Sequence, residues 1–228
     1  MQCEICSDVQ AVAQRAAEFI AAEARAGADA RGRFVLAVSG GTTPWLMLRA
    51  LAEQDVPWSK LHLVQVDERV APAGDPDRNL THLHESLLEH TPLPREQIHA
   101  MPVEEANLAS AAGHYADTLR QIAGAPAVLD LAHLGLGPDG HTASLVPGDP
   151  VLQIVDADVA LTGEYQGRRR MTLTYPMLNR ARRILWLVSG HAKVEMLKRL
   201  REGDPAIPAG RISRHQALIL ADRDAAPT

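Results

Sequence analysis

Uninterrupted hydrophobic runs alternate along this chain with segments in which hydrophobic residues recur every three or four positions. Such runs are typical of strands that are covered on both faces, as in the centre of a parallel sheet. The clearest runs lie at 34–38, 184–188 and 217–220, and two longer ones, at 61–66 and 128–136, include a few polar residues. Shorter candidate strands lie at 2–6, 98–100, 159–161 and 171–174.

The segments between these runs predict helices. Asp8 is placed to cap a helix from Val9 to about Ala26, which the turn Gly27–Gly32 follows. Further helices are predicted to begin at Pro44 and to cover about 80–89, 104–122, 175–179 and the segment after 193 up to 200. This alternation predicts a doubly wound α/β fold, with a mostly parallel sheet and helices on both faces. No linker divides the chain, so we expect a single domain over residues 1–228.

The segment Ser39–Pro44 follows one buried strand directly and combines two glycines with three hydroxyl residues. Thr43 is predicted to cap the next helix, with Pro44 as its first residue. Glycines let the backbone approach a ligand closely, and a helix N-terminus offers N–H groups and partial positive charge. The segment therefore favours anion binding over an ordinary corner. It lacks the Gly-Lys-Ser/Thr ending of a nucleotide-binding P-loop.

Charged residues lie at the ends of three other predicted strands. They follow two of these strands and precede the third. Asp67–Arg69 comes directly after the strand 61–66, and Ser189–Lys193 repeats the order of strand, small residues and helix start. Lys193 adds a mobile positive charge there. Arg168–Arg170 precedes the strand 171–174; three adjacent arginines usually form a solvated patch, but beside an anion site one of them can instead face the ligand.

The segment Gly135–Leu145 ends the strand 128–136 in glycines and then presents His141. A histidine at the carboxyl end of a strand is placed for acid–base chemistry, and Asp139 either orients its ring or shapes the turn. The glycine spacing also matches the dinucleotide-binding fingerprint. That fingerprint opens a long helix, whereas Pro147 interrupts this segment early, so we expect no nucleotide cofactor.

Composition narrows the class of protein. A hydrophobic content of 46% and a charged content of 22% are those of an ordinary soluble protein, and the net charge of −5 argues against nucleic-acid binding. No run is long enough for a membrane span and no secretory leader is visible, so a cytoplasmic location is expected. Cys3 and Cys6 are interpreted as strand residues. His82, His84 and His90 share no helical face at metal-ligand spacing and are interpreted as surface residues.

Together these motifs resemble those of the 6-phosphogluconolactonase family. The motifs appear in that family's order and span almost the whole chain: 39–44, 67–70 with 75–79, 135–145 and 189–193. The resemblance implies the fold of glucosamine-6-phosphate deaminases and ribose-5-phosphate isomerases. It implies cofactor-free hydrolysis of 6-phospho-D-glucono-1,5-lactone to 6-phosphogluconate, the second step of the oxidative pentose phosphate pathway.

The hypothesis assigns a role to each candidate residue. The predicted catalytic residues are His141, as general base, with Asp139, Asp67 and Arg170. The predicted phosphate-binding residues are Ser39, Gly40, Gly41, Thr42, Arg69 and Lys193. Backbone N–H groups are an alternative to Arg170 at the developing oxyanion, and a slip in register would replace Arg170 by Arg168. No metal or cofactor is assigned, and the only partner expected is the small sugar-phosphate lactone. The chain is expected to be a monomer or a small homo-oligomer.

Two other functions compete with this hypothesis. The first is an amino-sugar phosphate deaminase or a sugar-phosphate isomerase; the deaminases that the chain resembles carry a glutamate where this chain has Val146, which cannot hold a proton. A non-catalytic sugar-phosphate sensor is the second alternative. Sensors of this general fold usually carry a DNA-binding helix-turn-helix segment, and this chain has no basic one.

Overall fold

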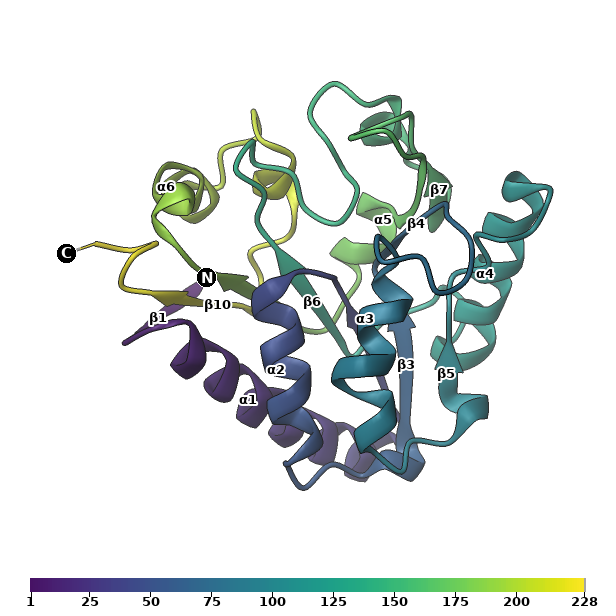
Figure 1. Cartoon of the computed structure of the whole chain (residues 1–228), viewed down its shortest axis with the longest axis horizontal. Coiled ribbons are helices and arrows are strands. Elements are labelled where there is room, and N and C mark those ends of the chain that lie inside the picture. Colours follow the sequence, from purple (N-terminus) through teal and green to yellow (C-terminus); the bar gives the residue numbers. More distant parts are fainter. Residues whose placement is uncertain (228) are drawn as a thin grey trace.

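The computed structural model describes residues 1–227, and its centre is a seven-stranded sheet with all neighbouring strands parallel (Figure 1). In spatial order its strands are β1 (Gln2–Cys6), β10 (Ala217–Asp222), β9 (Ile184–Val188), β6 (Leu131–Gly135), β2 (Phe34–Val38), β3 (Leu61–Gln65) and β5 (Ile98–His99). The predicted parallel α/β sheet is confirmed. Cys3 and Cys6 lie on β1, as predicted.

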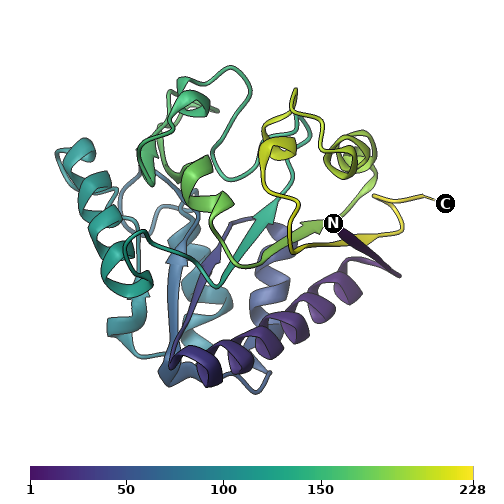
Figure 2. The ribbon, with the colours of Figure 1, turned by 180° about the vertical axis from the view of Figure 1, so that it is seen from behind.

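Helices cover both faces of this sheet, as the uninterrupted hydrophobic runs predicted (Figures 1 and 2). Along β2, Phe34 and Leu36 belong to one core, whereas Val35 and Ala37 belong to the other. The first core includes side chains of α1 (Val9–Arg31), α2 (Thr42–Ala52) and α3 (Asn79–Ser86). The second includes side chains of α4 (Leu108–Ala123), α5 (Tyr175–Asn179) and α6 (Val194–Glu202).

A second, three-stranded antiparallel sheet lies beside the second core, and the sequence did not predict it. Its strands are β4 (Asp67–Arg69), β8 (Arg170–Leu173) and β7 (Val159–Leu161), in the order β4-β8-β7. The charged residues Asp67–Arg69, predicted only to follow the strand 61–66, form a strand of their own. Asp67 pairs with Thr172 and Arg69 pairs with Arg170, so this sheet brings two predicted site segments together.

Several helix boundaries differ from the prediction because tertiary contacts and caps decide them. Helix α1 continues through Gly27 to Arg31, and Gly32 ends it with a left-handed φ of 73°. A Cβ on Gly27 would lie 2.5 Å from the Phe34 ring, so this glycine permits close packing and is not a turn residue. Helix α4 starts at Leu108 because the side chain of Asn107 accepts a hydrogen bond from the Ser110 N–H.

The predicted cap of α2 is wrong. The N-cap is Gly41, with φ 128° and ψ 164°, and not Thr43. This backbone conformation is open mainly to glycine, so the helix begins two residues earlier than expected. Pro44 then falls within the first turn, where its missing N–H has no helical partner to lose.

Candidate functional site

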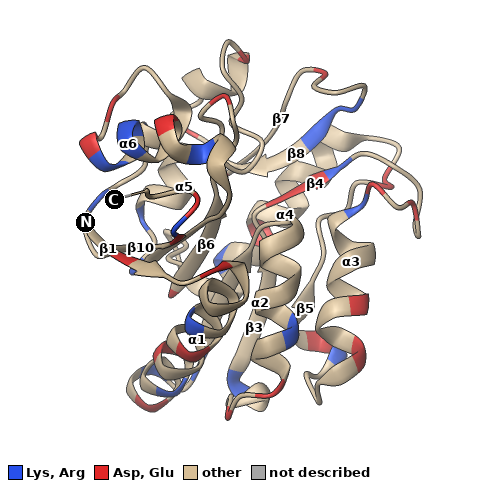
Figure 3. Cartoon of the chain, turned by 60° about the vertical axis from the view of Figure 1, so that its left-hand side comes forward, with Lys and Arg blue, Asp and Glu red and all other residues tan. Residues whose placement is uncertain are grey.

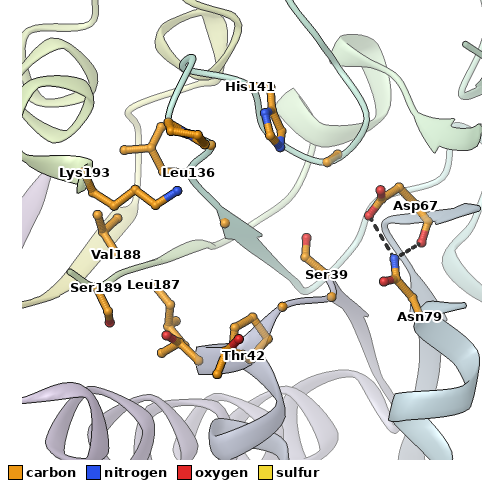
Figure 4. A pocket seen from close by; sticks show the side chains of 18 of the residues that line it. Ser39, Thr42, Asp67, Asn79, Leu136, His141, Leu187, Val188, Ser189 and Lys193 are labelled. Atoms are coloured by element: carbon orange, nitrogen blue, oxygen red, sulfur yellow. Dashed lines mark hydrogen bonds between the residues drawn. The ribbon is translucent and has the colours of Figure 1, made fainter. Parts of the chain in front are cut away.

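The candidate site lies at the topological switch point of the parallel sheet. After β2 the chain builds β3 and β5 on one side, then returns to place β6 on the other side of β2. A pocket of about 360 Å³ opens at the carboxyl ends of β2, β6 and β9, where open α/β sheets bind their ligands (Figure 4). Nine of the ten predicted site residues line it: Ser39, Gly40, Gly41, Thr42, Asp67, Arg69, His141, Arg170 and Lys193. Asp139, the tenth, contacts His141 directly.

The His141 side chain points into this pocket from the glycine-rich loop after β6 (Figure 4). Its Nδ1 lies 2.5 Å from Asp139 Oδ1, and the same oxygen accepts its backbone N–H at 3.1 Å. Asp139 therefore both shapes the turn and orients the ring, the two readings that the sequence left open. Because Nδ1 is held, Nε2 is the ring nitrogen that remains for a ligand.

The carboxyl group of Asp139 is ionised in this arrangement. Burial raises its pKa, but the N–H, side-chain and charge interactions with His141 outweigh burial and leave the pKa below its usual range. Gly137 leaves the space for the imidazole, since a Cβ there would lie 2.1 Å from His141 Nδ1.

The loop after β2 presents backbone groups to the pocket. Within the described residues no side chain caps α2, so the N–H groups of its first turn face the pocket end of the helix. A Cβ on Gly40 would lie 2.0 Å from Asn79 Oδ1, so only glycine permits this approach. The loop thus combines glycines with an uncapped helix N-terminus, an arrangement suited to an anion.

Two residues that hold this loop and the pocket wall were not predicted. His133, fully buried on β6, accepts the Ser39 N–H at Nδ1 (3.3 Å), and its carbonyl oxygen accepts from Ser39 Oγ (3.0 Å). Burial lowers the pKa of His133 to about 3, so the ring is neutral and able to accept. Asn79 donates from Nδ2 to the carbonyl oxygen of Asp67 at 2.9 Å (Figure 4). The sequence placed Asn79 only at the end of the motif 75–79, with no role assigned to it, and His133 only in a hydrophobic run.

Two buried acceptor oxygens of the lining, Asn79 Oδ1 and Ser189 Oγ, have no hydrogen-bond partner within residues 1–227, and neither do the buried Nε atoms of Arg69 and Arg170. A buried polar atom without a partner is costly, and in a pocket lining it marks a position for a ligand's hydroxyl or N–H group. Asp67 is also buried there, with Oδ2 accepting from Ser144 Oγ at 2.6 Å.

Three basic side chains line the pocket together with the carboxylate of Asp67: Arg69, Arg170 and Lys193. Burial lowers the pKa of both Arg170 and Lys193, and nearby carboxylates, Asp67 and Asp139 respectively, oppose the shift. In the view of Figure 4, Lys193 lies at one side of the pocket, with Asp67 and Asn79 at the other. A chain with a net charge of −5 thus gathers positive charge here, as an anionic ligand requires.

The structure distinguishes the three consecutive arginines. Arg170 is 5% exposed and lines the pocket, as predicted. Arg168 instead pairs with Asp75 and Asp77 at 3.1 and 3.0 Å, and Arg169 is exposed.

His82, His84 and His90, which were predicted to be surface residues, lie outside the pocket lining. His84 and His90 are exposed, whereas His82 is half-buried and stacks on Trp45 at 5.4 Å. Across residues 1–227 no group of three or more His, Cys, Asp or Glu side chains is arranged to hold a metal ion. No helix in the described part of the chain has the length and hydropathy needed to cross a bilayer.

Fold and pocket together define a parallel α/β protein with a histidine and an anion-suited loop at its switch point. Residues 7–220 match the family model described as Glucosamine-6-phosphate isomerases/6-phosphogluconolactonase, and the chain belongs to this family.

Sequence relatives agree with this assignment. The 6-phosphogluconolactonase of Mycobacterium tuberculosis is 38% identical over 211 residues, which cover 86% of this chain and 85% of the relative. The 6-phosphogluconolactonase of Nostoc sp. is 34% identical over 194 residues, which cover 83% of this chain and 80% of the relative. Among solved structures, the Thermotoga maritima 6-phosphogluconolactonase superposes with a TM-score of 0.86 at 26% identity, covering 97% of this chain and 98% of that chain. A monomeric glucosamine-6-phosphate deaminase has the same TM-score at 19% identity, so the fold alone does not separate the two chemistries.

Proposed function

We propose that this chain is an enzyme that hydrolyses 6-phospho-D-glucono-1,5-lactone to 6-phosphogluconate, the second step of the oxidative pentose phosphate pathway. The observation that carries the proposal is the imidazole of His141, oriented by Asp139, in a pocket that also contains three basic side chains. The curated relatives named above, which cover most of the chain, support the same substrate.

In the proposed reaction, Nε2 of His141 removes a proton from a water molecule as that water attacks the lactone carbonyl carbon. The carbonyl oxygen takes the negative charge of the tetrahedral intermediate. When this collapses, the bond to the ring oxygen breaks, and the imidazolium returns its proton to that oxygen. The product is a carboxylic acid, which ionises at neutral pH. A lactone is already an activated ester, so the scheme assigns no metal or cofactor.

The remaining pocket residues supply charge and position. Arg170 is proposed to stabilise the oxyanion, because it is buried in the lining and its Nε has no hydrogen-bond partner within the described residues. Asp67, held by Ser144 and Asn79, is proposed to position the water or a sugar hydroxyl. The substrate phosphate is assigned to Ser39, Gly40, Gly41, Thr42, Arg69 and Lys193.

The residue at Val146 favours hydrolysis over deamination. Its side chain is 6% exposed and apolar, so it offers no proton-transfer group beside the loop that carries His141. The decisive experiment is a coupled assay with freshly generated 6-phosphogluconolactone, measured above the spontaneous rate, beside an assay for ammonia release from glucosamine 6-phosphate. Lactone turnover without ammonia release supports the proposal. Ammonia release, or ligand binding without turnover, overturns it.

His141→Ala tests the proposed general base. Loss of a general base typically lowers the rate about 10²–10⁴-fold, so kcat is expected to fall by that range. The matched control is His84→Ala on α3, an exposed histidine outside the pocket lining, which should keep wild-type kcat. A His141→Ala enzyme within a few-fold of the wild-type rate would remove His141 from this role.

Lys193→Ala tests the phosphate site. The phosphate is remote from the reacting carbon, so its loss is expected mainly to raise KM, by about tenfold or more, with a smaller change in kcat. Lys198→Ala on α6 removes an exposed lysine of the neighbouring helix and should leave KM unchanged. An unchanged KM in Lys193→Ala would place the phosphate elsewhere.

A further inference from the structure

The turn between β7 and β8 reaches back to the candidate catalytic groups. Tyr165, which lies in this turn, donates from its hydroxyl to Asp139 Oδ2 at 3.3 Å. Its ring meets the His141 ring edge-on, with centroids 5.7 Å apart. The guanidinium carbon of Arg170 lies over the same ring at 4.9 Å. One side chain outside the predicted site thus contacts three of the four predicted catalytic residues.

These contacts complete the support of Asp139. Its Oδ1 accepts both the backbone N–H and the ring of His141, and its Oδ2 accepts from Tyr165. A carboxylate with donors on both oxygens cannot rotate without losing one of them. Burial raises the pKa of Tyr165 and Asp139 raises it further, so the hydroxyl keeps the proton that it donates.

The turn itself is held in place by charge. Gln166 and Gly167 have φ values of 54° and 76°, as in a two-residue type I′ turn, and the N–H of Tyr165 donates to the carbonyl oxygen of Arg168 at 3.0 Å. Arg168 in turn pairs with Asp75 and Asp77 of the loop after β4. Figure 3 shows basic residues at the start of β8 and acidic residues on the loop between β4 and α3. The ion pairs therefore fix the turn that carries Tyr165.

We propose that Tyr165 is a positioning residue for lactone hydrolysis, which holds the Asp139–His141 pair and Arg170 in their reactive orientation, and that Arg168 anchors it there. This inference rests on the proposed function. It assigns no contact between Tyr165 and the substrate, so its effect falls on kcat.

The first test is Tyr165→Phe, which removes the hydroxyl and keeps the ring. We expect kcat to fall about tenfold with KM within about twofold, since a small misplacement of catalytic groups has a large effect on rate. The pH profile of kcat/KM should also change, because Asp139 loses one of the donors that hold it against the His141 ring. The matched control is Tyr175→Phe, a buried tyrosine that also carries an arginine over its ring and donates to a carbonyl oxygen. It should leave both parameters and the pH profile unchanged.

The second test is a double-mutant cycle with Arg168. Arg168→Gln should lower kcat in the wild type but change it less than about twofold in a Tyr165→Ala background, because its effect passes through Tyr165. Additive effects overturn the anchoring role. An unchanged kcat and pH profile in Tyr165→Phe, or a raised KM alone, overturns the positioning role.

Failure of the inference and failure of the proposed function give different results. A wild-type protein without lactonase activity refutes the function. An active wild type with an unaffected Tyr165→Phe variant refutes only the inference. The ¹⁵N resonances of the His141 ring add a readout that needs no turnover, and they should differ between wild type and Tyr165→Phe but not Tyr175→Phe.

Discussion

Gly137 is the residue on which the place of the His141 imidazole depends most directly. Gly137→Ala puts a methyl group 2.1 Å from His141 Nδ1, so the ring has to move away from Asp139. We expect kcat to fall about 10²-fold while the protein still folds, because only the pocket loop is disturbed. Steady-state kinetics and a urea unfolding curve check both parts.

Gly135→Ala, at the last residue of β6 just before this loop, provides the control. No atom of residues 1–227 outside its immediate neighbours lies within 4 Å of a Cβ at this position, so kcat should stay near the wild-type value. Equal losses of kcat in the two variants would show that loop flexibility matters, and not the space beside the imidazole.

At the scale of elements, β4 and α3 are joined by one buried carboxylate. Glu68 is fully buried on β4 and accepts the backbone N–H groups of Asn79 and Leu80 at the start of α3, at 2.8 and 2.9 Å. The Arg78 Nε, from a side chain that is 2% exposed, lies 3.1 Å from the same carboxylate. This link places Asn79 against Asp67, and so it sets one wall of the pocket.

Glu68→Gln is therefore expected to destabilise the protein strongly. It leaves the buried Arg78 guanidinium without its buried counter-charge, and breaking such a pair costs about 3 kcal/mol or more. The control is Glu104→Gln, which removes the other partner of Arg78, a side chain that is 52% exposed. That change should cost less than about 1 kcal/mol. Urea unfolding compares the two, and similar losses would contradict the assigned role of Glu68.

For the whole molecule, one buried and two half-buried histidines make stability depend on pH. Burial lowers the pKa of His133 to about 3, and it also lowers the pKa values of His62 and His99, which contact each other across β3 and β5 at 3.1 Å. In the unfolded chain these histidines have a pKa of about 6.5, and in the folded protein their pKa is lower. Below pH 6.5 the unfolded chain therefore binds more protons than the folded protein does. Stability is therefore complete above that pH and is lost as the pH falls toward 3.

His133→Asn isolates the largest of these contributions, since its amide oxygen can still accept the Ser39 N–H but does not titrate. Between pH 7 and pH 5 the wild type should lose about 2 kcal/mol more stability than this variant, from 1.36 kcal/mol per pH unit below 6.5. The exposed His215 provides the control variant His215→Asn, which should follow the wild type. Equal pH dependence in His133→Asn and wild type would contradict a neutral, buried His133.

The sequence by itself determined the parallel α/β fold and most of the pocket lining. Uninterrupted runs such as Phe34–Val38 are stable only between two covering layers, and parallel strands bring their carboxyl ends to one edge. Residues in the segments that follow those strands, such as Ser39 and His141, are therefore expected in one pocket before any tertiary contact is known, and both line it. Local chemistry also identified Asp139, because it acts on a histidine only two residues away.

Only the tertiary structure decided which distant side chains support that pocket. The pairing of β4 with β8 depends on strand partners about 100 residues apart, and it brings Asp67 opposite Thr172. His133 lies in a hydrophobic run, and Tyr165 in an exposed turn, yet each reaches a site residue across the fold. Hydrophobic periodicity reports which face of an element is buried. It does not report which polar group on another element that face meets, because folding alone creates the contact.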